Sequence, residues 1–342
     1  IGKQIATTPI LEQDLLIFGT FDGTLEAVAA ADGREIWSLK LPDTVFSLAS
    51  DGEGTIYAGT GLHDSKTALM NAVQSSTGRI IWQREFTGHI EEPPGVDAKQ
   101  HRLFVGAGPG SLWALDTRSG DVLWHKDIGH LDGTPLLYGN ALYIPAQKSE
   151  ALHESFFYAL NPLNGETLWK LDQPGQPWAS PTIEKAGRVI LTTTGEGQIG
   201  RHAPGDKGWA QAVSTEGKTL WQRVLPDMAL TPNIYLPEND LMIYAAKNGM
   251  VTALKVADGS VTWETKIAGG FSAEGVLLEG FKEKVIAVMS EDGTLYLIDA
   301  LTGETILHRK MGRGGYSAPL AIGGLLYVTT RHNITALSEN RE

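Results

Sequence analysis

The chain has 342 residues, of which 42% are hydrophobic and 20% are charged, a composition typical of a soluble globular protein with a large core. No run of about 18 apolar residues occurs, so we expect no transmembrane segment. The formal net charge of −12 argues against nucleic acid as a partner, because phosphate binding requires clustered Lys and Arg. The absence of Cys excludes disulfides, thiolate metal sites and cysteine nucleophiles.

A short turn-and-strand motif recurs along the whole chain. A turn Gly is followed four residues later by Trp, and the seventh copy, after Gly303, ends in His308 instead. Successive copies lie 42 to 52 residues apart, a period that is typical of an array of four-stranded β units. The aromatic positions are Trp37, Trp82, Trp124, Trp169, Trp221, Trp263 and His308.

Each repeat contains four strand-like segments bounded by Gly, Asn and Pro. One repeat predicts strands over Thr231–Tyr235, Leu241–Ala245, Val251–Lys255 and Ser260–Ile267. Alternating or β-branched runs of this length are typical of strands, and no long 3.6-residue periodicity competes with them. The sequence therefore predicts an all-β protein.

The two ends of the chain together supply one further repeat. After His308 we expect only three strands, near Ala318–Leu320, Leu325–Val328 and Ile334–Leu337, and Ile1–Ile5 has the spacing of the missing fourth. Pairing Ile1–Ile5 with Ile334–Leu337 would close the ring and remove its free edges. We therefore predict a single domain over residues 1–342, an eight-bladed β-propeller of four-stranded antiparallel blades. The alternative is a seven-bladed ring with ragged ends.

The periodic Trp residues are interpreted as core. A large ring at the same place in every repeat is expected to pack between neighbouring blades and over the Gly turn, where it stabilises the fold. We expect His308 to weaken the corresponding contact rather than to act in catalysis.

The repeat resembles a known family. The segment Ala114–Trp124 is similar to the tryptophan-docking repeat of pyrroloquinoline-quinone-type propellers, and the resemblance covers the whole chain. In that family the same repeat serves quinoprotein dehydrogenases, envelope scaffolds and sensor domains of bacterial kinases. The resemblance therefore implies the fold more strongly than it implies a function.

The dehydrogenase members of this family imply parts that the sequence lacks. They hold their cofactor against a disulfide of adjacent cysteines and bind calcium through Glu, Asn and Asp. This chain has no Cys, and no Glu, Asn and Asp trio can be carried over. We therefore expect no catalytic residue, no cofactor, no metal site and no enzymatic activity.

The overall layout resembles the BamB family, the propeller lipoproteins of the outer-membrane barrel-assembly machinery. The resemblance rests on the chain length, the eighth repeat completed by the N-terminus, and the seventh repeat without Trp. It implies a protein-interaction scaffold in the periplasm or at the envelope. Where that family carries Arg-Gly before a Ser-Ala-Pro-like strand start, to grip its barrel partner, this sequence has Gln176–Pro181.

The candidate binding site is a ring at the funnel mouth. Positions three residues before the repeated Pro are expected to crowd there, and Glu274 replaces one such Pro. Aromatic and acidic groups together suit a cationic or peptide-like partner. The alternative is that the aromatic groups only plug the funnel. The candidate partner-binding residues are Phe46, Glu91, Asp132, Trp178, Phe271, Glu274 and Tyr316; Ala6 and Ala229 complete the ring.

Two histidines occupy matching loops ahead of successive repeats. His89 and His130 could ligate a transition metal with nearby carboxylates, unless the spacing between blades is too large. Long loops are predicted on the same face, and we expect that face to bind the partner. These loops span residues 61–66, 148–155 and 195–206.

Three classes of function stay open on the sequence alone. They are an envelope scaffold that binds protein partners, a ligand-sensing domain of a larger signalling chain, and a quinone-dependent oxidoreductase. The chain begins at Ile1 without Met, so we expect that a leader, a lipid anchor or a preceding domain has been removed. We expect the protein to be a monomer.

Overall fold

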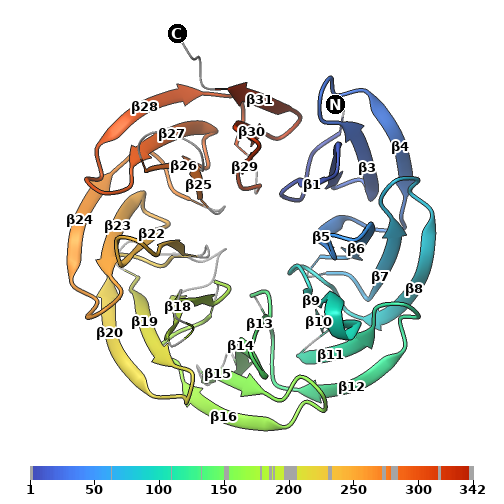
Figure 1. Cartoon of the computed structure of the whole chain (residues 1–342), viewed down its shortest axis with the longest axis horizontal. Coiled ribbons are helices and arrows are strands. Elements are labelled where there is room, and N and C mark those ends of the chain that lie inside the picture. Colours follow the sequence, from blue (N-terminus) through green and yellow to red (C-terminus); the bar gives the residue numbers. More distant parts are fainter. Residues whose placement is uncertain are drawn as a thin grey trace. The chain divides into compact units, whose positions relative to one another are not determined.

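The computed structural model confirms an all-β chain with the eight blades of a β-propeller (Figure 1). Among the described residues, the single helical element is one turn of 3-10 helix, η1 (Ala98–Gln100), and it is far too short to cross a membrane. The described residues are 3–62, 64–108, 110–131, 133–149, 154–177, 179–184, 187, 189–195, 206–229, 233–271, 275–278, 284–314 and 317–338.

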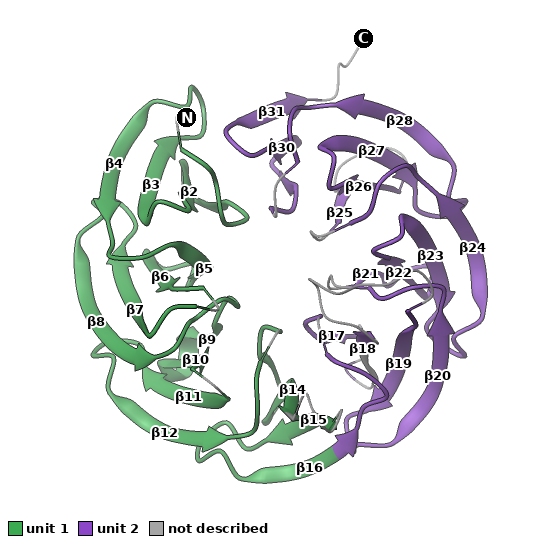
Figure 2. Cartoon of the chain, turned by 180° about the vertical axis from the view of Figure 1, so that it is seen from behind, with its two compact units in different colours: residues 1–170 green, residues 171–342 purple. Residues whose placement is uncertain are grey.

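Residues 1–170 form a first compact unit of four blades (Figure 2, green), which we call unit 1. In each blade four antiparallel strands follow one another in chain order. The strands are β1 (Ile10–Glu12), β2 (Leu15–Gly19), β3 (Thr24–Ala29), β4 (Glu35–Lys40), β5 (Val45–Ser50), β6 (Thr55–Thr60), β7 (Thr67–Gln74), β8 (Ile80–Thr87), β9 (Gly95–Asp97), β10 (Arg102–Ala107), β11 (Ser111–Asp116), β12 (Val122–Asp127), β13 (Leu136–Tyr138), β14 (Ala141–Ser149), β15 (Glu154–Leu160) and β16 (Thr167–Asp172).

Residues 171–342 form a second compact unit, unit 2, with the same strand order. The prediction of a single domain over residues 1–342 stays a prediction. The strands of unit 2 are β17 (Thr182–Ile183), β18 (Val189–Gly195), β19 (Gly208–Ser214), β20 (Thr219–Leu225), β21 (Ile234–Leu236), β22 (Leu241–Ala245), β23 (Met250–Lys255), β24 (Val261–Lys266), β25 (Val276–Leu278), β26 (Val285–Met289), β27 (Thr294–Asp299), β28 (Thr305–Lys310), β29 (Leu320–Ile322), β30 (Leu325–Thr329) and β31 (Ile334–Ser338).

The Trp residues dock onto the following blade within each unit, as the sequence predicts. Each indole Nε1 donates a hydrogen bond to a backbone carbonyl just after the third strand of the next blade, and apolar side chains of both blades surround the ring. A ring that buries its area and also satisfies its N–H stabilises the contact between blades. The bonds run from Trp37 to Ser75 (2.7 Å), Trp82 to Thr117 (2.7 Å), Trp124 to Pro162 (3.1 Å), Trp221 to Val256 (2.6 Å) and Trp263 to Ala300 (3.1 Å).

The repeated Gly is required by both conformation and space. Gly120 has φ +75°, a left-handed conformation that residues with a Cβ rarely adopt, and a Cβ there would lie 2.7 Å from Cε3 of Trp82. Gly78 meets Trp37 in the same way. The Gly turn is therefore the surface on which the preceding blade's indole rests.

A small residue and a bulge recur beside every docked Trp. Across the sheet from the Trp the third strand carries Ala, and the register shifts immediately afterwards. A β-bulge increases local twist and re-aims side chains, and the Ala methyl leaves room for the indole. The Ala residues are Ala27, Ala72, Ala114, Ala212 and Ala253.

His308 interrupts this series. It is exposed on β28 and stacks on Tyr296 of its own blade, with ring centroids 5.9 Å apart. The described residues of the last blade form a three-stranded sheet. Lys3–Ile5 lie against the first blade, where Ile5 bridges Thr20, and Ile1 and Gly2 are outside the described residues. The closing pair between Ile1–Ile5 and Ile334–Leu337 stays a prediction.

We predict that Gly120→Ala destabilises the protein more than Gly33→Ala does. Both glycines have positive φ, +75° and +72°, so each substitution costs about 1–2 kcal/mol in backbone conformation. Only the new methyl at residue 120 would clash with a docked indole, because no heavy atom lies within 4 Å of a Cβ at residue 33. Overpacking adds about 1–3 kcal/mol. Urea denaturation measures both free energies of unfolding, and equal losses would contradict the docking role of Gly120.

Candidate functional site

The candidate site lies where four loops of unit 1 are joined to one another, and we call these loops the loop face (residues 20–23, 41–47, 88–92 and 128–131). The Thr44 hydroxyl donates to the Phe21 carbonyl at 2.9 Å, and the Ser47 hydroxyl donates to the Glu92 carbonyl at 2.7 Å. Gly129 N–H donates to the carbonyl of Gly110, in the turn between β10 and β11. Successive loops are therefore held in place by hydrogen bonds rather than only by packing.

An aromatic pair marks the first part of the loop face. The rings of Phe21 and Phe46 meet edge to face, with centroids 6.1 Å apart and planes at 74°, and both side chains are half-buried. The sequence identifies Phe46 but misses Phe21. The signal for Phe21 is its place in the turn Thr20–Gly23, which corresponds to the turns at Asn248–Gly249 and Asp292–Gly293 in unit 2.

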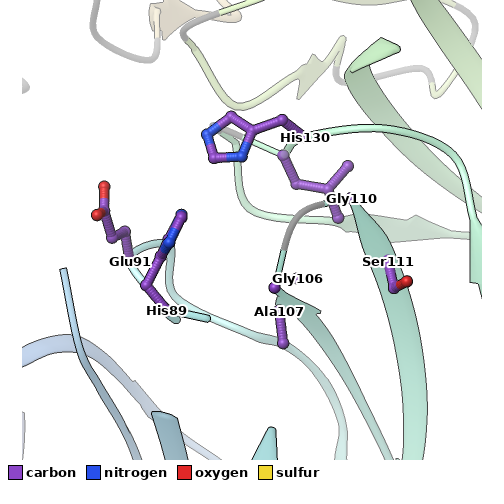
Figure 3. Close-up of a pocket in the computed structure, with 9 residues that line it drawn as sticks. His89, Glu91, Gly106, Ala107, Gly110, Ser111 and His130 are labelled. Carbon is purple, nitrogen blue, oxygen red and sulfur yellow. The ribbon is translucent and has the colours of Figure 1, made fainter. Parts of the chain in front are cut away.

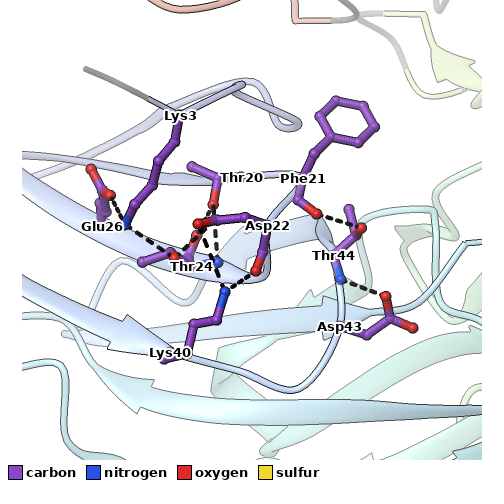
Figure 4. A network of polar contacts seen from close by, with 9 residues as sticks. All are labelled: Lys3, Thr20, Phe21, Asp22, Thr24, Glu26, Lys40, Asp43 and Thr44. Carbon is purple, nitrogen blue, oxygen red and sulfur yellow. Dashed lines mark hydrogen bonds and ion pairs between the residues drawn. The ribbon is translucent and has the colours of Figure 1, made fainter.

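A polar network holds the turn that carries Phe21 (Figure 4). The hydroxyls of Thr20 and Thr24 donate to Oδ1 of Asp22 at 2.6 and 2.9 Å, and Lys40 approaches the same carboxylate. The hydrogen bond from Thr20 is the main reason that the pKa of Asp22 lies below its ordinary value. Asp22 is therefore charged at neutral pH, and its turn has a fixed shape.

The loops that carry the aromatic pair and the next loop also carry carboxylates. Asp43 accepts a hydrogen bond from the Ser65 hydroxyl at 2.6 Å, which joins the loop at residues 61–66 to the loop face. Glu91 and Glu92 follow in the next loop, and both are half-buried. These loops of unit 1 therefore combine apolar rings with negative charge, and their place in a ring at a funnel mouth stays a prediction.

A polar pocket lies in the second part of the loop face (Figure 3). It is small, with a cavity volume of about 10 Å³, and is lined by His89, Glu91, His130, Ser111 and the β10–β11 turn. The two imidazoles meet with centroids 5.4 Å apart and planes at 60°. The concern that the spacing between blades separates these histidines is therefore wrong. Among the described residues, no group of three or more His, Asp or Glu is arranged to hold a metal ion.

Glycine allows the loops around this pocket to approach closely. Gly129 has φ +108°, and a Cβ there would lie 2.3 Å from the carbonyl oxygen of Gln147. This contact lets His130 form two backbone hydrogen bonds with Gln147, at 2.7 and 2.8 Å. The backbone position of His130 is therefore fixed by its own blade.

The structure places the other predicted site residues differently. Phe271 is only 1% exposed and packs in a hydrophobic cluster with Trp263 and Ile267, so it is a core residue of unit 2 rather than part of an exposed mouth. Burial of a large aromatic side chain is worth about 1.5–3 kcal/mol, which favours this position. The ring as a whole takes residues from both units and stays a prediction. Four predicted residues lie outside the described residues: Asp132, Trp178, Glu274 and Tyr316.

The difference from the resembled family at Gln176–Pro181 concerns one blade only. Gln176 forms a two-way backbone bridge with Gly195 at the start of unit 2. An Arg-Gly pair does precede a Ser-Ala-Pro segment elsewhere in the chain, at Arg313–Gly314 before Ser317–Pro319. This difference therefore does not separate the chain from that family.

Comparison with known proteins agrees with the repeat and the fold. A family model described as outer membrane protein assembly factor BamB matches residues 21–194, 154–276, 206–305 and 247–340. The chain belongs to this family. Its members in the comparison include the outer membrane protein assembly factor BamB of Moranella endobia, 24% identical over 268 residues. That match covers 74% of this chain and 63% of the relative, so it spans less than two thirds of the relative's length.

Solved structures and enzymes with the same repeat are also similar. The crystal structure of BamB from Moraxella catarrhalis matches with a TM-score of 0.73 at 17% identity and covers 97% of this chain and 95% of that chain, which shows the fold. The quinoprotein alcohol dehydrogenase PedH of Pseudomonas putida is 24% identical over 69% of this chain and 43% of its own length. Similarity of the repeat therefore extends to proteins named as enzymes.

We predict that Asp22→Asn removes stability that is present near pH 7 and is lost as the pH falls through the lowered pKa of Asp22. Because folding lowers the pKa of Asp22, the charged side chain stabilises the native state above the ordinary Asp value of about 3.8, and this contribution is lost as the pH falls through the lowered value. The exposed carboxylate is screened, so the loss at pH 7 should stay within about 1 kcal/mol.

Urea unfolding of both proteins at several pH values measures this difference, with Asp32→Asn as an exposed control. Asp32 accepts a bond from the backbone N–H of Arg34. A difference between wild type and Asp22→Asn that does not shrink as the pH falls below the ordinary Asp pKa of about 3.8 would contradict the assignment to the charged carboxylate.

Proposed function

We propose that the protein is a non-catalytic propeller that acts as a protein-interaction scaffold in the bacterial envelope, with a role in outer-membrane protein assembly. The observation that carries this proposal is the family match, because the matched segments together run from residue 21 to residue 340. A match confined to one blade would support the repeat but not the role.

The loop face of unit 1 is the proposed recognition surface. Apolar anchors beside charged groups are what interaction hot spots are made of, and a strong anchor costs about 2 kcal/mol or more on truncation. Phe21 and Phe46 supply apolar area that is pre-ordered by the Asp22 turn, and Asp43 and Glu92 supply negative charge. A segment of a partner protein with Lys or Arg next to an apolar side chain fits this chemistry.

The proposed location is the periplasm, at the outer membrane. This location follows from the family's description as an outer-membrane assembly factor. The absence of Cys from the sequence favours no particular compartment. A lipid anchor attached ahead of Ile1 would hold the scaffold at the membrane. The proposed partner is a protein of the outer-membrane assembly machinery, and the scaffold itself is proposed to be a monomer.

Because some relatives are named as enzymes, an enzymatic function is the second class to consider. A quinone-dependent dehydrogenase would need a cofactor site, and resemblance to that group implies a disulfide of adjacent cysteines, which this chain cannot form. A ligand-sensing domain of a larger signalling chain is the remaining alternative. The scaffold proposal is favoured over both because the matching family model is that of the assembly factor.

We predict that cells without this protein contain less folded outer-membrane barrel protein, and that the double variant Phe21→Ala/Phe46→Ala does not restore it. Loss of both rings removes the apolar anchors while the Asp22 turn remains. The measurement is the amount of heat-modifiable barrel protein in isolated outer membranes, compared between the deletion strain and strains that express each variant at equal level.

Leu163→Ala serves as the matched control, because Leu163 is 71% exposed in the turn between β15 and β16, at the opposite end of its blade from the loop face. It should restore barrel proteins fully. Normal barrel levels in the deletion strain would remove support for the assembly role. Full restoration by the double variant would show that the loop face of unit 1 is not the recognition surface.

We predict no dehydrogenase activity. After incubation with pyrroloquinoline quinone and calcium, the protein should not reduce an electron-accepting dye in the presence of primary alcohols or aldoses. The control is the same mixture without protein. Turnover clearly above this control would overturn the non-catalytic assignment and favour the oxidoreductase alternative.

A further inference from the structure

Two imidazoles from successive loops meet in one pocket of unit 1 (Figure 3). His89 precedes β9 and His130 precedes β13, so the side chains come from neighbouring blades and are 41 residues apart in the sequence. Their ring centroids are 5.4 Å apart, and the ring planes are inclined at 60°. The pocket that both imidazoles line has a volume of about 10 Å³, and Glu91 and Ser111 line it too.

This separation is the one that a shared metal ion requires. With a metal–nitrogen distance of about 2.0–2.1 Å and about 1.2 Å from nitrogen to ring centre, two imidazoles on one tetrahedral ion have centroids about 5 Å apart. Inclined rings suit such a site, because each ligating nitrogen points at the ion in the plane of its own ring. We propose that His89 and His130 bind one divalent transition-metal ion of the zinc class.

The surroundings of the two histidines favour a cation. Glu91 places a carboxylate in the same pocket, and the chain has a net charge of −12. The carboxylate can remain outside the coordination sphere and still lower the energy of a bound cation through charge. Imidazole nitrogen is a ligand that zinc, copper and nickel accept, whereas magnesium and calcium prefer oxygen. The site therefore discriminates between these two groups of metals.

The backbone holds the two ligands before any ion binds. His130 is fixed by its paired hydrogen bonds with Gln147, and the His89 carbonyl accepts a hydrogen bond from Gly108 N–H at 3.1 Å. Ligands positioned in advance lose less entropy on binding. The proposal names two protein ligands, because no third His, Asp or Glu among the described residues completes a set of metal ligands. A two-imidazole site of this kind is an exchangeable metal site rather than a permanent structural one.

The test is zinc binding to the intact chain, measured by calorimetry after removal of metal with a chelator. The comparison includes wild type, His89→Ala, His130→Ala and the control His308→Ala. His308 is exposed and stacks on Tyr296 in unit 2, so it is matched in residue type but distant in sequence from the pocket. Circular dichroism verifies that each variant is folded.

We expect one saturable zinc site in wild type and in His308→Ala, and a dissociation constant at least about tenfold higher in each pocket variant. Magnesium should produce no such binding. If Cu²⁺ replaces zinc, its electron paramagnetic resonance spectrum should show two imidazole nitrogens in wild type and fewer in the pocket variants. The proposal is overturned if wild type shows no saturable zinc binding, or if folded His89→Ala and His130→Ala bind zinc as tightly as wild type.

Discussion

The contact between each docked indole and the Gly turn of the following blade is the constraint on which the rest of each unit depends. A blade of four short strands has two apolar faces and cannot bury both by itself. The Trp of one blade covers the turn of the next and hydrogen-bonds to its backbone, as Trp82 does at Gly120 and Thr117. Packing of successive blades and the position of every loop follow from this repeated contact.

The sequence predicts the fold well because the contact is periodic. The turn position requires a residue without a Cβ, and the Trp side chain requires a surface on which to pack. The fixed separation of Gly and Trp can be read from the sequence without knowing which strands pair. The replacement of Trp by His308 can also be read from the sequence. The His308 side chain stacks on Tyr296 of its own blade instead of docking on the next. The fourth strand of the last blade is less predictable, because it depends on chain ends that have no turn of their own to set their register.

The candidate site is predicted only in part, because sites depend on loops that have no period. Phe46 and Glu91 lie on the loop face, and their role in binding stays a prediction. Phe271 is buried in the core beside Ile267, a contact that the spacing of the repeat cannot reveal. Phe21 is missed because it lies in the turn between β2 and β3, whereas the counted positions lie at or before the first strand of a blade. The contact of His89 with His130 accompanies close approaches between glycines of the adjoining loops, such as Gly88 to Gly108 and Gly110 to Gly129, which the spacing of the repeat does not reveal.

The two ends of a blade differ in how freely the length of their connections can change. The Gly turn between the third and fourth strands cannot change length without moving the indole contact, whereas the opposite end takes up added chain. Between Trp169 and Trp221 the interval grows to 52 residues, and the added length includes the connection from β18 to β19. The docking contact at Trp221 is unaffected. Chain length can therefore vary at the loop-bearing end of a blade while the indole contact at the other end keeps its geometry.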